Sequence, residues 1–119
     1  TELCSIDGLE YVAIPDGVEL PGQPSQIADS IESVELTPEL RAQIMIRSPH
    51  VELINQRIAE KIRDRYTIDD ELYYARIAGG VSLGMYEPLP GELQELAEYK
   101  DYVESIRAWG RQQRALLGL

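Results

Sequence analysis

Residues 37–65 read TPELRAQIMIRSPHVELINQRIAEKIRDR and contain two signals for the start of a helix. Each signal is a hydroxyl residue followed by proline, Thr37-Pro38 and then Ser48-Pro49. A Ser or Thr at the N-cap accepts a hydrogen bond from the first turn, and proline suits the next position because an N–H there would lack a helical partner. The stretch therefore predicts two successive helices joined by a corner.

The helical pattern extends in both directions from this stretch. Apolar residues at spacings of three and four mark the buried face of the helix that follows Ser48, namely Val51, Ile54, Ile58 and Ile62. Thr67 opens a further helix, which Gly79-Gly80 is expected to end, and residues 79–91 are expected to form a loop. In all, about five helices are expected near 25–33, 38–47, 49–65, 68–78 and 92–117. We therefore predict a mainly α-helical domain with a long C-terminal helix.

The N-terminal part of the chain has a different pattern. Asp7-Gly8 lies between two short apolar stretches, which is the strongest local signal for a β-hairpin. We expect strands over 4–6 and 10–14. Residues 1–24 are then a hairpin and an extended segment, and 25–119 are the helical part of a single domain.

Composition limits the function. The chain has 119 residues, 44% of them hydrophobic and 27% charged, which is ordinary for a globular domain. Its net charge of −10 argues against a general nucleic-acid binder, which needs a basic surface for the phosphates. No run of 18 apolar residues occurs, so no membrane-spanning segment is expected. With one cysteine, Cys4, an internal disulfide and a cysteine-based zinc site are excluded.

No catalytic pattern is found. His50 has no second histidine or metal-binding motif beside it, and no base is placed near Cys4. Two acidic clusters, 69–71 and the ladder Glu92, Glu95 and Glu98, lie in the opening turns of expected helices, where carboxylates complement the helix dipole. We therefore expect no catalytic residue, no bound cofactor and no metal ion.

Aromatic residues suggest a binding surface. Seven of the eight tyrosine and tryptophan residues lie in the second half of the chain, and such side chains are favoured where a protein meets a partner. A seam along the last helix is formed by Leu93, Leu96, Tyr99, Val103, Ile106 and Trp109. Tyr102 lies beside this seam, and Arg111 continues its polar edge. We predict that Tyr102, Trp109 and Arg111 bind a partner protein.

Two stretches resemble a known family. EKIRDRYTIDDEL at 60–72, followed after the Gly/Pro-rich break by EYKDYVESIRAWGRQQRALLGL at 98–119, is similar to small tail-associated proteins of tailed bacteriophages. LTPELR at 36–41 resembles openings found in tail-fibre and tail-assembly accessory proteins. The resemblance covers about 36–119. It implies a helical, non-enzymatic protein of virion structure or assembly, and it carries no catalytic residues.

Several functions are open at this point. The first is a phage tail or tail-fibre accessory protein that docks onto a larger tail or fibre protein, or onto itself as a homo-oligomer, in the virion or in the host cytoplasm during assembly. The alternative is an acidic phage-encoded inhibitor of a host defence or regulatory protein. A small enzyme would have to depend on the carboxylate ladder alone, and a helical binding domain of another kind also remains.

Overall fold

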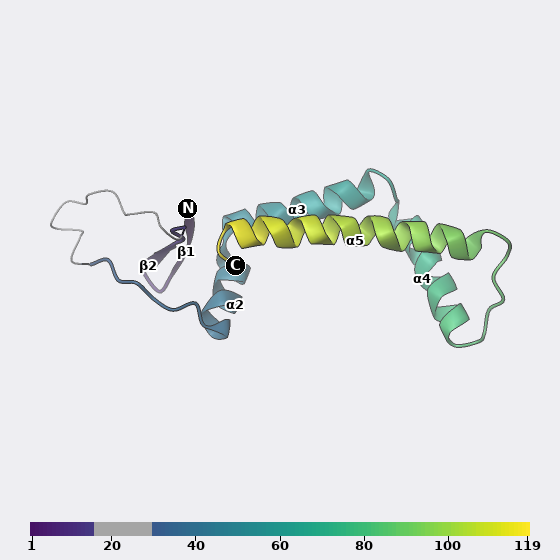
Figure 1. The fold of residues 1–119 in the computed structure, drawn as a ribbon, viewed down its shortest axis with the longest axis horizontal. Coiled ribbons are helices and arrows are strands. Elements are labelled where there is room, and N and C mark those ends of the chain that lie inside the picture. Colours follow the sequence, from purple (N-terminus) through teal and green to yellow (C-terminus); the bar gives the residue numbers. More distant parts are fainter. Residues whose placement is uncertain (16–29) are drawn as a thin grey trace. The chain divides into compact units, whose positions relative to one another are not determined.

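A computed structural model describes residues 1–15 and 30–119. In these residues a two-stranded hairpin, β1 (Glu2–Ile6) and β2 (Leu9–Val12), precedes four helices (Figure 1). The helices are α2 (Pro38–Arg47), α3 (Pro49–Arg63), α4 (Ile68–Ser82) and α5 (Glu92–Leu116). The predicted class is confirmed: a mainly helical protein with an N-terminal hairpin and a long C-terminal helix.

The expected count of about five helices is wrong, because the described residues contain four. The additional helix was placed at 25–33. Residues 25–29 lie outside the described residues, and 30–33 are not helical. Ile31 and Val34 are both exposed. A short helix is stabilised mainly by packing of its apolar face, and Ile31, the described residue of that face, is not packed.

The chain divides into two compact units. Unit 1 contains Thr1–Leu53 and Gln113–Leu119, and unit 2 contains Ile54–Gln112. The division expected from the sequence, at residues 24 and 25, lies outside the described residues.

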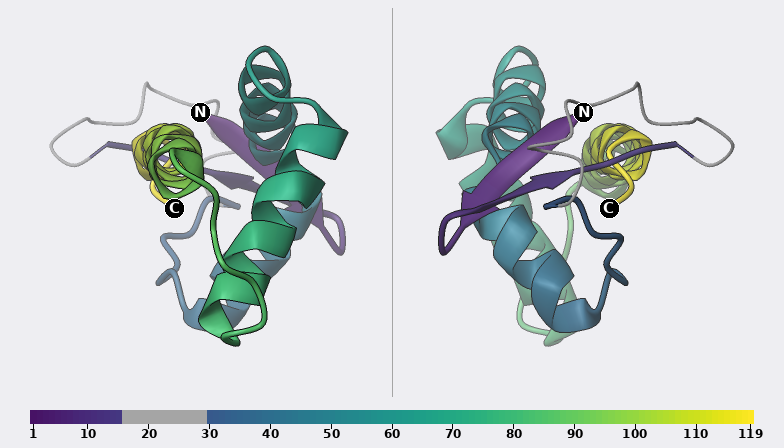
Figure 2. Two further views of the ribbon diagram at one scale, coloured as in Figure 1. Left: turned by 90° about the vertical axis from the view of Figure 1, so that its right-hand side faces the viewer. Right: turned by 90° about the vertical axis from the view of Figure 1, so that its left-hand side faces the viewer.

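The hairpin of unit 1 has the expected turn. Asp7 and Gly8 both have positive φ, 51° and 82°, as a two-residue type I′ turn requires. The antiparallel register pairs Ile6 with Leu9, and a bulge follows Glu2. The hairpin lies against α2 (Figure 2), and Leu3, Ile6 and Ile44 form a small buried core between them.

The two proline-marked helix starts form as predicted. The Thr37 hydroxyl accepts a hydrogen bond from the Leu40 N–H at 3.2 Å, and α2 begins at Pro38. The Ser48 hydroxyl accepts one from the Val51 N–H at 3.4 Å and is fully buried. Unit 1 is closed by the C-terminus, where the Arg41 guanidinium donates to the Leu119 carbonyl at 2.9 Å.

The end of α4 differs from the prediction. Gly79 and Gly80 lie inside the helix, which continues to Ser82. Gly84 terminates it two residues later: a φ of +70° there allows the Met85 N–H to bond the Gly80 carbonyl and the Gly84 N–H to bond the Val81 carbonyl. The expected loop over 79–91 therefore begins about four residues later.

Gly80 is in the helix for a packing reason. A Cβ at Gly80 would lie 2.7 Å from the Cβ of Tyr86, which folds back against the helix. A Cβ at Gly79 would have no neighbour within 4 Å among the described residues. Only one of the two glycines is needed by the contacts of unit 2.

This difference gives a matched pair of substitutions. We expect Gly80→Ala to lower the free energy of unfolding by about 1–3 kcal/mol, because Tyr86 has to move. Gly79→Ala should raise it by up to about 1 kcal/mol, because alanine favours the helix and meets no atom. Chemical denaturation of both variants measures the difference. Equal effects of the two substitutions would contradict the packing of Tyr86 on Gly80.

Unit 2 is organised around an aromatic cluster. The chain runs out along α3 from Ile54, turns through α4 and returns along α5, which lies beside α3 (Figures 1 and 2). The ring of Tyr66 is buried and meets Tyr74, Tyr99 and Tyr102 edge-on, with ring centroids 5.0 to 5.9 Å apart. Ile54, Ile77 and Ile106 are also buried. Tyrosine thus fills much of the core in a chain without phenylalanine.

Candidate interaction surfaces

The structure brings two of the three predicted binding residues together. Tyr102 and Trp109 are seven residues apart on α5 and share a face. The Tyr102 hydroxyl donates to the Lys61 carbonyl at 2.8 Å, and the Lys61 ammonium lies 3.9 Å from the centre of the Trp109 ring. Both side chains therefore connect α5 to α3.

Arg111 lies elsewhere on α5. Two residues after Trp109, it is turned by about 200° around the helix axis. Its guanidinium pairs with the Glu104 carboxylate at 2.6 Å. Hydrogen bonding from Arg111 lowers the pKa of Glu104 from its usual value. The binding role of Tyr102, Trp109 and Arg111 stays a prediction, and each of the three has a contact within unit 2.

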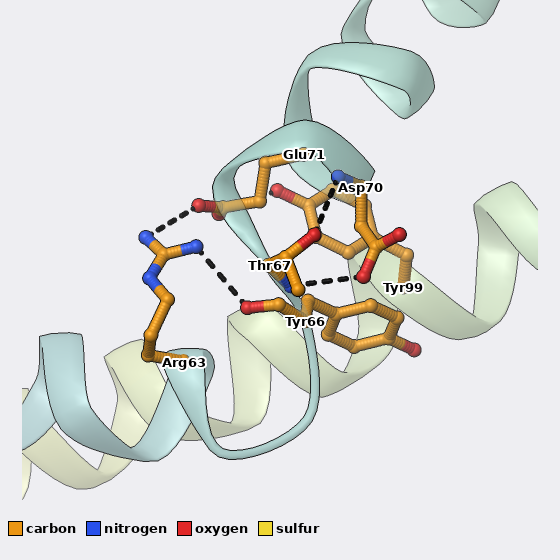
Figure 3. Close-up of polar contacts among 6 residues, drawn as sticks. All are labelled: Arg63, Tyr66, Thr67, Asp70, Glu71 and Tyr99. Carbon is orange, nitrogen blue, oxygen red and sulfur yellow. Dashed lines mark hydrogen bonds and ion pairs between the residues drawn. The ribbon is translucent and has the colours of Figure 1, made fainter.

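The corner between α3 and α4 is held by a polar network (Figure 3). Thr67 and Asp70 form a full capping box, each side chain accepting from the other's backbone N–H. The Glu71 carboxylate accepts from the Tyr99 hydroxyl and from the Arg63 guanidinium, both at 2.8 Å. The hydrogen bond from Tyr99 is the main cause that lowers the pKa of Glu71, while burial and this bond raise the pKa of Tyr99 to about 12. The network fixes where α4 leaves α3.

A second polar centre holds the connection between α4 and α5. The carboxylate of Glu92 is buried and accepts three hydrogen bonds, from the Tyr73 hydroxyl, from the Tyr86 hydroxyl at 2.6 Å and from the Leu89 N–H at 2.6 Å. These bonds lower the pKa of Glu92, Tyr73 contributing most, and the bond to Glu92 raises the pKa of Tyr73 to about 12. Glu92 lies in the first turn of α5 as expected, but its burial and its three hydrogen bonds were not predicted.

We expect Glu92→Gln to lower the melting temperature by roughly 5 °C or more, because an amide cannot accept all three bonds. Glu95→Gln, on an exposed side chain of the same helix, is the control and should change the melting temperature little.

The pKa of Glu92 is lower in the folded chain than its usual 4.5, so the stabilisation that its carboxylate provides is present above about pH 4.5 and is lost as the pH falls through the folded pKa. The difference in melting temperature between wild type and Glu92→Gln should therefore become smaller at acid pH. A gap independent of pH would contradict an ionised Glu92.

His50 and Cys4 lie on the same pocket of unit 1. Both line a shallow pocket of about 200 Å³, together with residues of the hairpin. No hydrogen bond between the two is found, and no group of three His, Cys, Asp or Glu among the described residues is placed to hold a metal ion. In the same residues, no helix combines the length and the apolar character needed to cross a bilayer.

The outer face of α4, formed by Ile68, Leu72 and Leu83, is apolar and uncovered. At 100° per residue these three side chains lie within about 60° of one another, on the side away from Ile77. They are 63%, 48% and 75% exposed. Gly79 lies between them, where no Cβ fills the surface. In the segment that follows α4 along the chain, Met85 and Leu89 are also exposed.

A groove lies on another side of α4, between it and α5. Its volume is about 530 Å³. Its floor is mainly apolar, formed by the half-buried Tyr74, Val81, Leu96, Tyr99 and Val103 and the exposed Ala75 and Ala78, and its rim is charged, with Glu71, Lys100, Glu104 and Arg107. We name it the α4–α5 groove. The groove was not predicted, because α4 was expected to end at residue 78, although the spacing of Ala75, Ala78 and Val81 is helical.

Comparisons with known proteins do not place the chain in a family. No family model matches it, and neither a curated protein nor a solved structure does. The resemblance to tail-associated phage proteins therefore stays a prediction.

Proposed function

We propose that the chain works by docking onto other proteins rather than by catalysis, as an accessory protein of a phage tail or tail fibre. In this role it acts in the virion or, during assembly, in the host cytoplasm. The setting comes from the resemblance of residues 36–119, and docking is supported by the surface of unit 2.

The observation that carries the docking proposal is the outer face of α4. Single exposed apolar side chains are normal on a protein surface, but a helix face that exposes several of them around a bare glycine is typical of an interaction site. The glycine matters because a helix-interior glycine costs about 1 kcal/mol relative to alanine. Gly80 offsets that cost by accommodating Tyr86. No such contact explains Gly79, and the close approach of a partner backbone would explain why a glycine stands there.

The titratable groups of unit 2 also fit a structural role. Glu71 binds Tyr99 and Arg63, Glu92 binds two tyrosines and a backbone N–H, and Glu104 binds Arg111. Hydrogen bonding lowers the pKa of all three carboxyl groups, which suits fixed acceptors better than proton donors at neutral pH.

The acidic inhibitor is the second candidate, favoured by the net charge of −10. The two differ in how binding depends on salt. Docking by apolar surface is little affected by salt, whereas an acidic protein that binds a basic site weakens steeply as salt screens the charges.

The test is co-expression of the chain with the tail and fibre proteins encoded beside its gene, followed by size-exclusion chromatography at low and high salt. We expect a complex that survives high salt. Mass spectrometry of purified particles then shows whether the chain remains in the virion. A chain that forms no complex with any of these proteins would overturn the proposal.

A further inference from the structure

The charges at the rim of the α4–α5 groove are unevenly paired. Both rim carboxylates have a cationic partner, Glu71 with Arg63 at 2.8 Å and Glu104 with Arg111 at 2.6 Å. The two rim cations, Lys100 and Arg107, are exposed, and neither lies within 4 Å of a carboxylate oxygen of the described residues. The groove is thus an apolar floor beside two positive charges that act on Glu104 through space but form no ion pair with it.

A segment of unit 1 has the opposite character. Residues 31–36 read IESVEL and lie outside any helix or strand. The three apolar side chains, Ile31, Val34 and Leu36, are all exposed, and so are the two carboxylates, Glu32 and Glu35. Apolar side chains that alternate with carboxylates in this way are suited to an apolar surface edged by cations.

The spacing of the charges also agrees. Lys100 and Arg107 are seven residues apart on a helix, which is about 10 Å along its axis. Glu32 and Glu35 are three residues apart, which in a polyproline II chain, with three residues per turn, places both on one side about 9 Å apart. The wall of the groove from Leu96 to Arg107 and the extended segment 31–36 both measure roughly 16 Å.

We propose that the α4–α5 groove binds residues 31–36 of a second copy of this chain, with Glu32 and Glu35 facing Lys100 and Arg107. The contact occurs twice in a symmetric dimer, because each copy carries one groove and one segment. Burial of Ile31 and Val34, which share another side of such a polyproline II chain, supplies affinity, and the charges set the register of the segment. The dimer does not use the outer face of α4, so it stands whether or not the chain binds a tail protein.

The test is a charge exchange followed by sedimentation velocity over a concentration series. The groove variant carries Lys100→Glu with Arg107→Glu, and the segment variant carries Glu32→Lys with Glu35→Lys. Wild type should approach twice its mass of 13.4 kDa. Each variant alone should dimerise at least about tenfold more weakly, because like charges then face each other. An equimolar mixture should regain the dimer, since every segment then finds a groove of opposite charge.

A control separates this contact from general repulsion between acidic chains. Arg57→Glu with Arg76→Glu changes the net charge as much as the groove variant does, at exposed side chains that do not line the groove. This control should dimerise as wild type does. A wild type that stays monomeric throughout, a groove variant that dimerises normally, or a mixture that stays monomeric would each overturn the proposal. Loss of the dimer with binding to tail proteins intact would leave the proposed function standing.

Discussion

Replacing Tyr66 by alanine is expected to lower the free energy of unfolding by about 3–5 kcal/mol. The ring is only 9% exposed and touches three other tyrosine rings, two of them on α5. Its removal leaves a cavity at the point where α3, α4 and α5 meet, and edge-to-face ring pairs are lost in addition to buried area. Trp109 is the only tryptophan and belongs to unit 2, so its fluorescence during chemical denaturation reports this loss.

Tyr66→Phe is the matched control. No hydrogen bond of the Tyr66 hydroxyl is found among the described residues, and no buried polar atom lacks a partner there. The phenyl ring keeps the packing, so the change should stay below about 1 kcal/mol. If the alanine variant were as stable as the phenylalanine variant, the tyrosine cluster would not be the core of unit 2.

In unit 1 the largest effect is expected at Ile44, where substitution by alanine should cost about 2–5 kcal/mol. Ile44 is 2% exposed and packs with Leu3 and Ile6 of the hairpin. A two-stranded hairpin is marginal in water unless it packs against another element, so the hairpin should lose its structure together with this contact. Faster hydrogen exchange of the β1 and β2 amides measures that loss.

Ile46→Ala provides the comparison on the same helix. Ile46 is 84% exposed, and its substitution should change stability by less than about 0.5 kcal/mol. Hairpin amides that exchange equally fast in the two variants would show that Ile44 does not hold β1 and β2 in place.

Much of the fold could be predicted because its signals are local. Thr37 and Thr67 cap helices through bonds that span three residues, and Asp7-Gly8 makes a turn by its own backbone preference. Such signals are independent of the rest of the chain. For the same reason the starts of α2 and α4 were placed correctly, and the strands were misplaced by only about two residues.

The errors concern contacts between distant residues. Gly80 was read as a helix end, but it is needed where Tyr86 folds back onto α4. Glu92 has the pattern of an exposed acidic residue, and its burial depends on two tyrosine hydroxyls and a backbone N–H that the fold brings to it. Leu93 was expected in the seam of α5 and is exposed, because its neighbour Glu92 faces inward instead.

The candidate surfaces were predictable only in part. The aromatic character of α5 led to the prediction that Tyr102 and Trp109 bind a partner, which stays a prediction, and the sequence pattern could not reveal that Lys61 of α3 contacts both. The outer face of α4 and the α4–α5 groove depend on the true length of that helix. Neither surface was predicted, because Val81 of the groove and Leu83 of the outer face lie beyond residue 78, where α4 was expected to end.

The most direct test of the central claim, docking through the outer face of α4, is the affinity for the co-expressed tail or fibre protein when this face is made polar. Ile68→Glu combined with Leu83→Glu should weaken the complex at least about tenfold, or about 1.4 kcal/mol, without unfolding the chain, since both side chains are largely exposed. Ile46→Glu combined with Leu9→Glu is the control, with comparable exposure in unit 1, and should bind normally. Unchanged affinity of the α4 variant would contradict the account.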